Sequence, residues 1–349
     1  MRGIRARTGL TGPRTGLRGW GGVAAMAFVC ALAVVCALLL PRAAGPHTAA
    51  SAAGGGRTAR AAQAEADACT DPQDQSVPPS TAEGTAIAAI KKRGHLSVGV
   101  DQNSFNWGYR DPNSTDKNVQ LEGFDIDLAR RLAKDIFNDS DPARIRFQAI
   151  PTTERVPAIR KARVDVVVRT MTITCDRLKD VAFSAPYFVT GQQVLAPKSS
   201  DITGYNDTLD GKKVCSAKSS TALDRLTADR KSGELASSVD ISTVVPNQLD
   251  CLVRLQLGQV DAVLTDGALA ASQAAQDPTV ELKGDPLTPE YYGVAMKKDA
   301  TDLEARVNKI LEDYRKDGSW ADSYRKWLAP TLGADFGPAM PPEPHYRAG

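Results

Sequence analysis

The sequence predicts an α/β protein with two lobes of similar design and a binding crevice at the ends of their strands. Short apolar runs alternate with amphipathic segments along the middle of the chain, a pattern typical of strands and helices that follow one another in a mostly parallel sheet. One helix-to-strand unit, VPAIRKARVDVVVRT at residues 156–170, recurs as LVRLQLGQVDAVLTD at residues 252–266. The repeated unit indicates a repeated lobe.

Length and charge limit the classes of function. The 349 residues have room for about two domains. The 43 Lys and Arg nearly balance the 41 Asp and Glu, and no basic stripe is interleaved with aromatics. Nucleic acid is therefore excluded as a partner.

The N-terminal 40 residues have the composition of an export segment. Residues 1–22 carry five arginines and no acid, and residues 23–40 are an apolar run of 18 residues. Three outcomes are open: an uncleaved anchor, a cleaved signal, or lipidation at Cys30 or Cys36. Each places the rest of the chain outside the cytoplasm, attached to the membrane or secreted.

Residues 41–84 are rich in Ala, Gly, Ser and Pro, which predicts a flexible tether. The first lobe should begin with a helix at 85–94 and a strand at 96–100, and continue with helix 124–137, strand 145–150, helix 156–161 and strand 164–168. The loop after the first strand offers Asp101, Phe105 and Trp107 to the crevice wall. An aromatic core beneath the loop is the alternative for Trp107.

Residues 164–188 are the stretch around which the first lobe is organised. Thr170, Thr172 and Arg177 follow a β-branched strand, and two hydroxyls with a guanidinium at such a strand end can clamp a carboxylate. The alternative is a turn capped by Asp176 with a surface arginine. Asp125 and Asp127 are better explained by the start of their helix than by a catalytic pair.

The pattern restarts after residue 209. Residues 191–197 should be a strand leaving the first lobe, and residues 211–217 the first strand of the second. Ser220 and Thr221, after Lys218, can form an anion site at a helix N-terminus or merely cap that helix. Asp266 ends the repeated unit where Thr170 ends the first, so an acid faces an arginine across the crevice, which suits the zwitterion of an amino acid.

The chain should return to the first lobe through a strand at 291–297 and finish with amphipathic helix over 301–329. Residues 330–349 are Pro-rich and predict a loose tail. Beyond the N-terminal run the cysteines are Cys69, Cys175, Cys215 and Cys251, and four cysteines outside the cytoplasm allow three disulfide pairings. Without a CxxC motif or a nearby histidine they are not expected to hold a metal.

Three motifs carry a resemblance to a known family: GFDIDLARRLAKDIF, TMTITCDR followed by VAFSAPYF, and GQVDAVLTD. Over residues 85–329 the chain resembles the family 3 extracellular solute-binding proteins, the polar amino-acid receptors of ABC importers. It is most similar to the actinobacterial glutamate/glutamine-binding branch, which shares the cysteines of TITCDR, KKVCS and LDCLVRLQ.

The resemblance implies the periplasmic-binding-protein type II fold, with two α/β lobes joined by a two-strand hinge and the ligand cleft between them. Lobe 1 would comprise residues 85–192 and 292–329, and lobe 2 residues 193–291. It also implies disulfides Cys69–Cys175 and Cys215–Cys251.

The resemblance assigns roles to the candidate residues. Arg177, helped by Thr170 and Thr172, would bind the α-carboxylate, and Asp266, supported by Asp101, the α-ammonium. The closing loop would supply Ser220 and Thr221, with Lys218 at its rim. Arg155 would read a distal carboxylate and Arg169 is a second cation nearby, whereas Gln102 replaces an arginine of some acidic-ligand relatives. Glutamate, aspartate, glutamine and asparagine therefore all remain open.

The leading hypothesis is a monomeric binding protein without cofactor or catalysis that delivers one of these amino acids to an ABC importer. A sensor that passes occupancy to a membrane partner is the alternative. An extracytoplasmic dehydratase on the same fold is a third hypothesis, and it would need a general acid or base beyond Asp266 and Asp101.

Overall fold

The computed structural model describes residues 69–115, 120–335, 337–341 and 343–347. All of them belong to one structural unit, Ala66–Gly349. The expected export segment at residues 1–40 and the tether up to residue 68 lie outside the described residues. Within the described part of the chain, no helix has the length and apolar composition needed to cross a membrane.

The first lobe is built on a five-stranded sheet of order β4-β1-β5-β13-β6. Strand β1 is parallel to β4 and β5, whereas β13 is antiparallel to β5 and β6. The strands at 96–100 and 145–150 are confirmed, but the run at 164–168 forms only a two-residue strand. The bounds are β1 Leu96–Val100, β4 Ile145–Ala149, β5 Val166–Val167, β6 Val181–Phe183 and β13 Ala295–Lys297.

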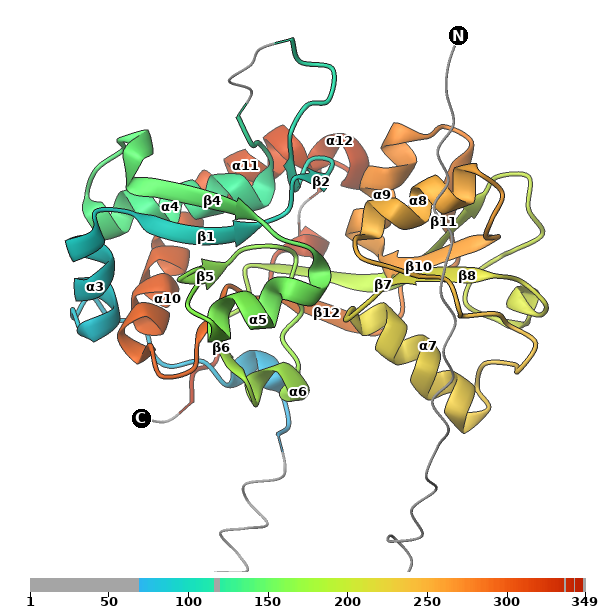
Figure 1. Cartoon of the computed structure of the whole chain (residues 1–349), viewed down its shortest axis with the longest axis horizontal. Coiled ribbons are helices and arrows are strands. Elements are labelled where there is room, and N and C mark those ends of the chain that lie inside the picture. Colours follow the sequence, from blue (N-terminus) through green and yellow to red (C-terminus); the bar gives the residue numbers. More distant parts are fainter. Residues whose placement is uncertain (1–68, 116–119, 336, 342, 348–349) are drawn as a thin grey trace, which may run out of the picture. The chain divides into compact units, whose positions relative to one another are not determined.

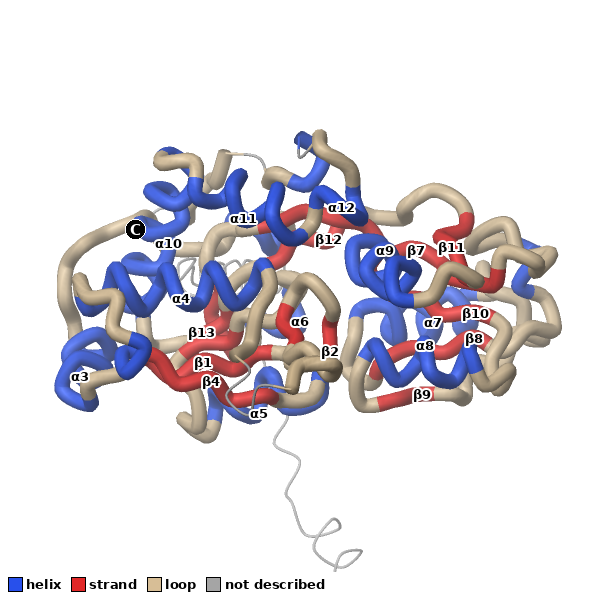
Figure 2. The backbone as a smooth tube through the Cα atoms, turned by 90° about the horizontal axis from the view of Figure 1, so that it is seen from above, coloured by secondary structure: helices blue, strands red, loops and turns tan. Residues whose placement is uncertain are grey.

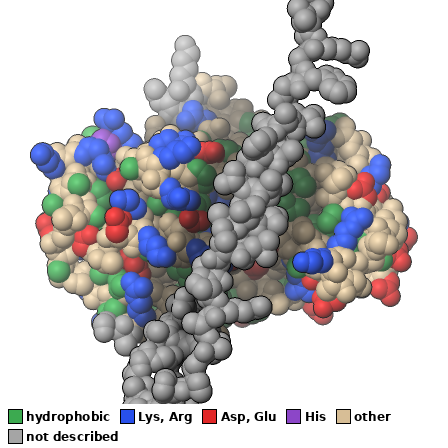
Figure 3. Space-filling view, turned by 60° about the horizontal axis from the view of Figure 1, so that its bottom comes forward, with side chains coloured by type: hydrophobic (Ala, Val, Ile, Leu, Met, Phe, Trp, Pro, Cys, Tyr) green, Lys and Arg blue, Asp and Glu red, His purple; other side chains and the backbone are tan. Residues whose placement is uncertain are grey.

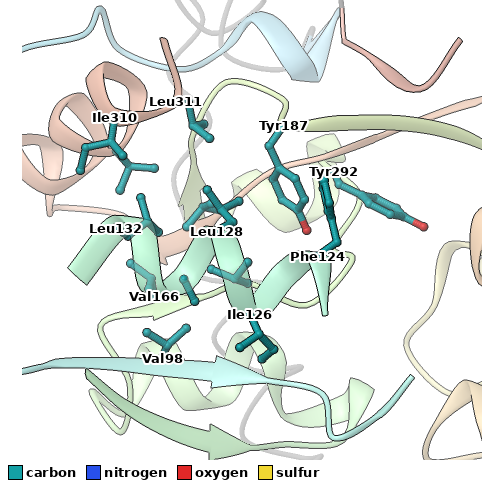
Figure 4. Packing of buried hydrophobic residues seen from close by; sticks show 14 of the residues in the cluster. Val98, Phe124, Ile126, Leu128, Leu132, Val166, Tyr187, Tyr292, Ile310 and Leu311 are labelled. Atoms are coloured by element: carbon teal, nitrogen blue, oxygen red, sulfur yellow. The ribbon is translucent and has the colours of Figure 1, made fainter. Parts of the chain in front are cut away.

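Helices cover both faces of this sheet (Figure 1). One core cluster joins β1 to α4 and α10, and a second joins α5 to the opposite face. Figure 4 shows Leu128 and Leu132 of α4 between the sheet residues and Ile310 and Leu311 of α10, which explains the four-residue apolar spacing of α4. The bounds are α3 Thr85–Arg93, α4 Phe124–Phe137, α5 Arg155–Arg160, α10 Thr301–Lys316 and α11 Ser319–Trp327.

The second lobe has a six-stranded sheet of order β11-β7-β10-β8-β9, with β12 also paired to β7. Helix α7 packs on one face, and α8 and α9 on the other (Figures 1 and 2). The bounds are β7 Phe188–Pro197, β8 Val214–Ala217, β9 Val244–Val245, β10 Ala262–Asp266, β11 Val280–Lys283, β12 Pro289–Tyr292, α7 Thr221–Ser232, α8 Gln248–Gln256 and α9 Gly267–Gln276.

Two antiparallel strands join the lobes. The β7 residue Phe188 lies in the core of the first lobe, whereas Val194 of the same strand lies in the core of the second. Strand β12 runs back along the first half of β7. The predicted strand 291–297 is therefore interrupted: its start pairs with β7 in the hinge, and its end enters the first sheet as β13. The two-lobed fold with a two-strand hinge is confirmed.

Short elements complete the chain. They are α6 Cys175–Leu178, α12 Ala329–Leu332, the β2–β3 hairpin of Asn103–Ser104 and Gly108–Tyr109, and the 3₁₀ turns Pro72–Asp74, Pro142–Arg144, Thr152–Glu154, Asp207–Leu209 and Gly337–Ala339. On the face that Figure 3 displays, Lys and Arg side chains lie among Asp and Glu side chains.

Both ends of the described chain are more ordered than composition predicted. Glu304 of α10 accepts hydrogen bonds from the Ser76 hydroxyl at 2.9 Å and the Val77 N–H at 2.8 Å. The prediction of a flexible tether is therefore wrong for residues 69–84. The loose tail is also wrong where it is described, because Ala339 is buried in the first core and the Arg347 N–H donates to the Ser76 carbonyl at 3.0 Å. Composition cannot reveal these contacts, since Ser76 and Val77 lie more than 200 residues from Glu304.

Candidate functional site

The loop after β5 is held by a buried carboxylate. Asp125, 1% exposed, accepts the Thr170 N–H at 2.9 Å and the Tyr187 hydroxyl at 2.8 Å. Thr170 has a positive φ of 40°, an uncommon conformation for a β-branched residue that such fixed contacts can maintain. Burial raises the pKa of Asp125 to about 7, although its two hydrogen bonds lower it. Asp125 thus shapes the loop, a role that its place at a helix start did not indicate.

Arg177 follows this loop in the short helix α6. The Thr174 hydroxyl accepts the Arg177 N–H at 3.2 Å and so caps the helix. The guanidinium donates to the Thr172 carbonyl at 2.6 Å and to the Ser219 carbonyl of the second lobe at 3.1 Å. The structure therefore brings Arg177 beside Thr172, as expected, and also across to the opposite lobe.

Arg155 lies in the same place but is more deeply buried, at 3% exposure. It donates to the Thr152 carbonyl at 3.2 Å, the Thr170 carbonyl at 3.3 Å and the Ser219 carbonyl at 3.1 Å. Burial lowers its pKa, as does the charge of Arg177. An arginine nevertheless stays charged in proteins. Ser219 thus presents one carbonyl to two guanidiniums.

Two carboxylates face these arginines from the second lobe and the hinge. Asp266, the last residue of β10, accepts the Tyr292 hydroxyl at 2.6 Å. Glu290 of β12 accepts the Gln192 amide at 2.7 Å and the Thr221 hydroxyl at 3.1 Å. Both acids are buried, at 7% and 5% exposure. The cleft therefore combines two cations with two acids, the charge pattern that complements a zwitterion.

The charges of the cleft act on one another. Burial and the negative charge of Glu290 raise the pKa of Asp266 to about 7, whereas the Tyr292 hydrogen bond and the charges of Arg155 and Arg177 lower it. Burial lowers the pKa of Arg177, and Glu290 is the first of the acids that raise it. Glu290 is thus electrostatically part of the site.

Asp101 and Arg169 pair with each other rather than with Arg177. Arg169, fully buried, lies 2.8 Å from Asp101, whose carboxylate also accepts the N–H groups of Gln102 and Asn103. Asp101 therefore supports Arg169 and its own loop, which leaves it little capacity for an ammonium.

A second contact between the lobes, which we call the lateral contact, starts from this pair. Arg169 donates to the Thr152 hydroxyl at 3.0 Å and to the Asn247 side chain at 3.2 Å. The Thr152 hydroxyl donates to Gln248 at 3.1 Å, and the Thr152 N–H donates to the Pro246 carbonyl at 3.3 Å. Apart from the Arg169 guanidinium, every donor and acceptor in the lateral contact is uncharged.

The other candidates lie in the cleft, in the core or on the surface. Thr221 reaches Glu290 as described, whereas the Ser220 hydroxyl caps α7 by accepting the Leu223 N–H at 3.2 Å. Lys218 is exposed and Phe105 is partly buried against Tyr109. Trp107 is wrong as a wall residue: it is fully buried among the rings of Phe124, Phe188 and Tyr292. The aromatic core beneath the loop, the alternative interpretation, accounts for it.

Both expected disulfides are present. Cys69–Cys175 ties the start of the described chain to the residue two positions before Arg177, and Cys215–Cys251 ties β8 to α8. The second bridge is fully buried, whereas Cys69 is exposed. Cys175 therefore covalently ties α6, which carries Arg177, to the start of the described chain.

Two residues of the cleft were missed from the sequence, Glu290 and Tyr292. The strand period of two could have found them, because it puts both on the same face of β12, where they are buried and Tyr291 between them is less so. The prediction of a continuous strand from residue 291 excluded Glu290 from consideration.

Comparison with known proteins supplies the family. Residues 96–330 match the model of the bacterial extracellular solute-binding proteins, family 3. The ABC transporter glutamine-binding protein GlnH of Bacillus subtilis is 34% identical over 242 residues, which cover 69% of this chain and 84% of that protein. The glutamate-binding protein GluB of Corynebacterium efficiens is 28% identical over 261 residues, 72% of this chain and 83% of that protein.

The fold is also shared with solved structures. An ancestral amino-acid-binding protein described as a precursor of cyclohexadienyl dehydratase has 30% sequence identity and a TM-score of 0.60, covering 70% of this chain and all of that one. The residues that match the family model span both sheets and the hinge. The chain belongs to the bacterial extracellular solute-binding proteins, family 3.

Proposed function

We propose that the protein binds a free polar amino acid between its lobes, outside the cytoplasm, and delivers it to an ABC importer. The observation that carries the proposal is the meeting of Arg155 and Arg177 with Asp266 and Glu290. A carboxylate fits the guanidiniums, which offer bidentate donors, and an ammonium fits the acids. The names of GlnH and GluB support glutamine and glutamate as the ligands to test first.

Within this proposal, Arg177 binds the α-carboxylate and Arg155 the side chain of the ligand. Arg177 is the more exposed of the two and adjoins Thr172, whereas Arg155 is buried behind Thr170. A ligand carboxylate replaces the Ser219 carbonyl as acceptor, and its negative charge and two oxygens form a bidentate ion pair with a guanidinium that a single neutral carbonyl cannot form. The exchange therefore favours binding.

A thermal-shift screen across the twenty amino acids tests the proposal, because a ligand that binds the native state raises its melting temperature. Glutamate, glutamine, aspartate or asparagine should give the largest shift. The proposed ligand class is wrong if none of the four shifts the transition.

Two variants test the division of labour. Arg177→Ala should abolish the shift for every amino acid, whereas Arg155→Ala should weaken acidic ligands more than amides. Losing one partner of a buried charged pair costs about 3–5 kcal/mol, so the Arg177→Ala affinity should fall at least a hundredfold. Isothermal titration calorimetry measures the affinity of both variants for each ligand. If both variants lose the same affinity for acidic and amide ligands, the separate roles of Arg177 and Arg155 are contradicted.

Catalysis needs a separate test because Glu290 supplies the second carboxylate that the sequence did not reveal. Both its oxygens accept hydrogen bonds, from Gln192 and Thr221, and neither faces a histidine among the described residues. We infer binding without turnover. NMR after prolonged incubation should return the amino acid unchanged, and a new product would support an enzyme instead.

A further inference from the structure

The two arginines and the two buried acids between the lobes carry a net charge of zero when all are ionised; Asp224 of α7, a third acid near Arg177, is exposed and is left out of this sum. Arg155 and Arg177 contribute two positive charges, and Asp266 and Glu290 two negative ones. Arg169 does not enter this sum, because Asp101 pairs with it at 2.8 Å. A neutral zwitterion such as glutamine preserves the balance, whereas glutamate adds one negative charge to a buried site, which is unfavourable unless it is compensated.

Glu290 is placed to control that balance. It lies on β12, where it pairs with Thr190 of β7, and Gln192 two residues farther along β7 donates to it at 2.7 Å. Gln192 is also the residue that pairs with Asp266 on β10. The two acids therefore adjoin the same residue of the hinge strand, one through its side chain and one through the sheet.

We propose that Glu290 determines the selectivity of the cleft by charge: an amide ligand binds without proton exchange, whereas an acidic amino acid binds together with one proton, which Asp266, beside the negative charge of Glu290, takes from the solvent. The inference rests on the proposed function and specifies its ligand chemistry. Two carboxylates in one buried site commonly share a proton, because they cannot both ionise without cost.

The surroundings of the pair support uptake near neutral pH. Asp266 is faced by Glu290 and Tyr292 of β12 and by Arg155 and Arg177 of the first lobe. Glu290 is faced by Thr221 of α7 and Gln192 of β7, and Asp224 of α7 faces Arg177. Burial raises the pKa of Asp266 to about 7. Above that pH the Asp266 carboxyl of the free protein is mostly unprotonated, so a proton must be taken up from the solvent when glutamate binds.

The sign of the pH dependence follows. When one proton accompanies binding, affinity falls about tenfold for each pH unit above the pKa of Asp266 in the free protein and levels off below it. Glutamate affinity should therefore rise from pH 8.5 to pH 7, while glutamine affinity stays nearly constant.

Calorimetric titration at pH 8 in two buffers of different ionisation enthalpy counts the protons directly. We expect about one proton taken up per glutamate and close to none per glutamine. Equal counts for the two ligands would overturn the proposal. Aspartate and asparagine provide the same comparison.

Glu290→Gln tests the residue, since glutamine keeps the shape of the side chain and an acceptor for Gln192. The ratio of the glutamate Kd to the glutamine Kd should fall roughly tenfold or more, as expected when one negative charge leaves a partly screened site. Glu234→Gln, the same exchange on an exposed loop of the second lobe, should leave the ratio unchanged.

The possible outcomes distinguish a failure of this inference from a failure of the proposed function on which it rests. If the wild-type protein binds neither ligand, the proposed function fails. If it binds both but Glu290→Gln leaves the ratio and the proton count unchanged, only the role of Glu290 fails. If the variant does not fold, the wild-type proton counts decide alone.

Discussion

Replacing Asp125 by asparagine should make the protein less sensitive to pH, which tests how the loop of Thr170 is held. Asparagine keeps the shape of the side chain: its oxygen can accept the Thr170 N–H, and its amide can donate to the Tyr187 hydroxyl. The variant removes the proton equilibrium but not the contacts.

The magnitude follows from the raised pKa. The pKa of Asp125 rises from 3.8 to about 7 on folding because the carboxyl is buried. A group whose pKa is raised in the folded state stabilises it fully below the unfolded pKa, and this contribution is lost as the pH rises through the folded pKa. At about 1.36 kcal/mol per pKa unit, wild-type protein should lose about 4 kcal/mol from this group between about pH 4 and pH 7.

Urea denaturation of both proteins at pH 4.5, 5.5, 6.5 and 7.5, without ligand and with both disulfides intact, measures the difference. The stability of Asp125→Asn relative to wild type should rise steadily over that range. Since every other titrating group is common to both proteins, only the difference between the curves is needed. If the stabilities of the two proteins change with pH in parallel, the pKa of Asp125 is not raised by folding and the reasoning is refuted.

A second variant checks the cause of the shift. The Tyr187 hydroxyl lowers the pKa of Asp125, so Tyr187→Phe should raise it further. The pH at which stability stops falling should then move upward. A move downward would mean that the hydroxyl favours the protonated acid instead.

Two further predictions concern the disulfides and the tail. Mild reductant followed by alkylation and mass spectrometry should label Cys69 and Cys175 before Cys215 and Cys251, because the second bridge is fully buried; the reverse order would contradict this arrangement. Deleting residues 333–349 should lower the free energy of unfolding by about 2 kcal/mol and increase the binding of a hydrophobic dye, since Ala339 and Met340 pack on the first core. Unchanged stability would show that the tail only rests on the surface.

The sequence predicted the elements whose apolar period is complete. Residues 96–100 form β1 as expected, and residues 124–137 form α4, because each buries a regular face against one sheet. The strand predicted at 291–297 was not identified correctly, because it is divided between β12 and β13. Gly293 lies where the chain leaves β12 for β13, and a Cβ there would lie 2.8 Å from the Ile173 side chain. Such a close approach has no signal in a single sequence.

For the site, the order of charges along the chain indicated Arg177 and Asp266, because Arg177 follows a buried strand and Asp266 ends one. It did not indicate that Arg155 and Arg177 share the Ser219 carbonyl, since that contact depends on how the two lobes meet. Asp125 shows the same limit: its helix position explained an acid, but its partner Thr170 lies 45 residues away. Residues that support others across the fold are the ones a pattern does not identify.

The lateral contact of Thr152 and Arg169 with residues 246–248 bears on how fast a captured amino acid can leave. If opening of the cleft breaks these bonds, they lengthen the residence time of every ligand by the same factor, whatever its side chain. A tighter contact would raise affinity and slow handover together. The lateral contact has a single guanidinium bond to Asn247 and an uncharged hydrogen bond between Thr152 and Gln248, so it stabilises the closed state only weakly. A weakly stabilised closed state suits a binding protein that must release its ligand as well as bind it.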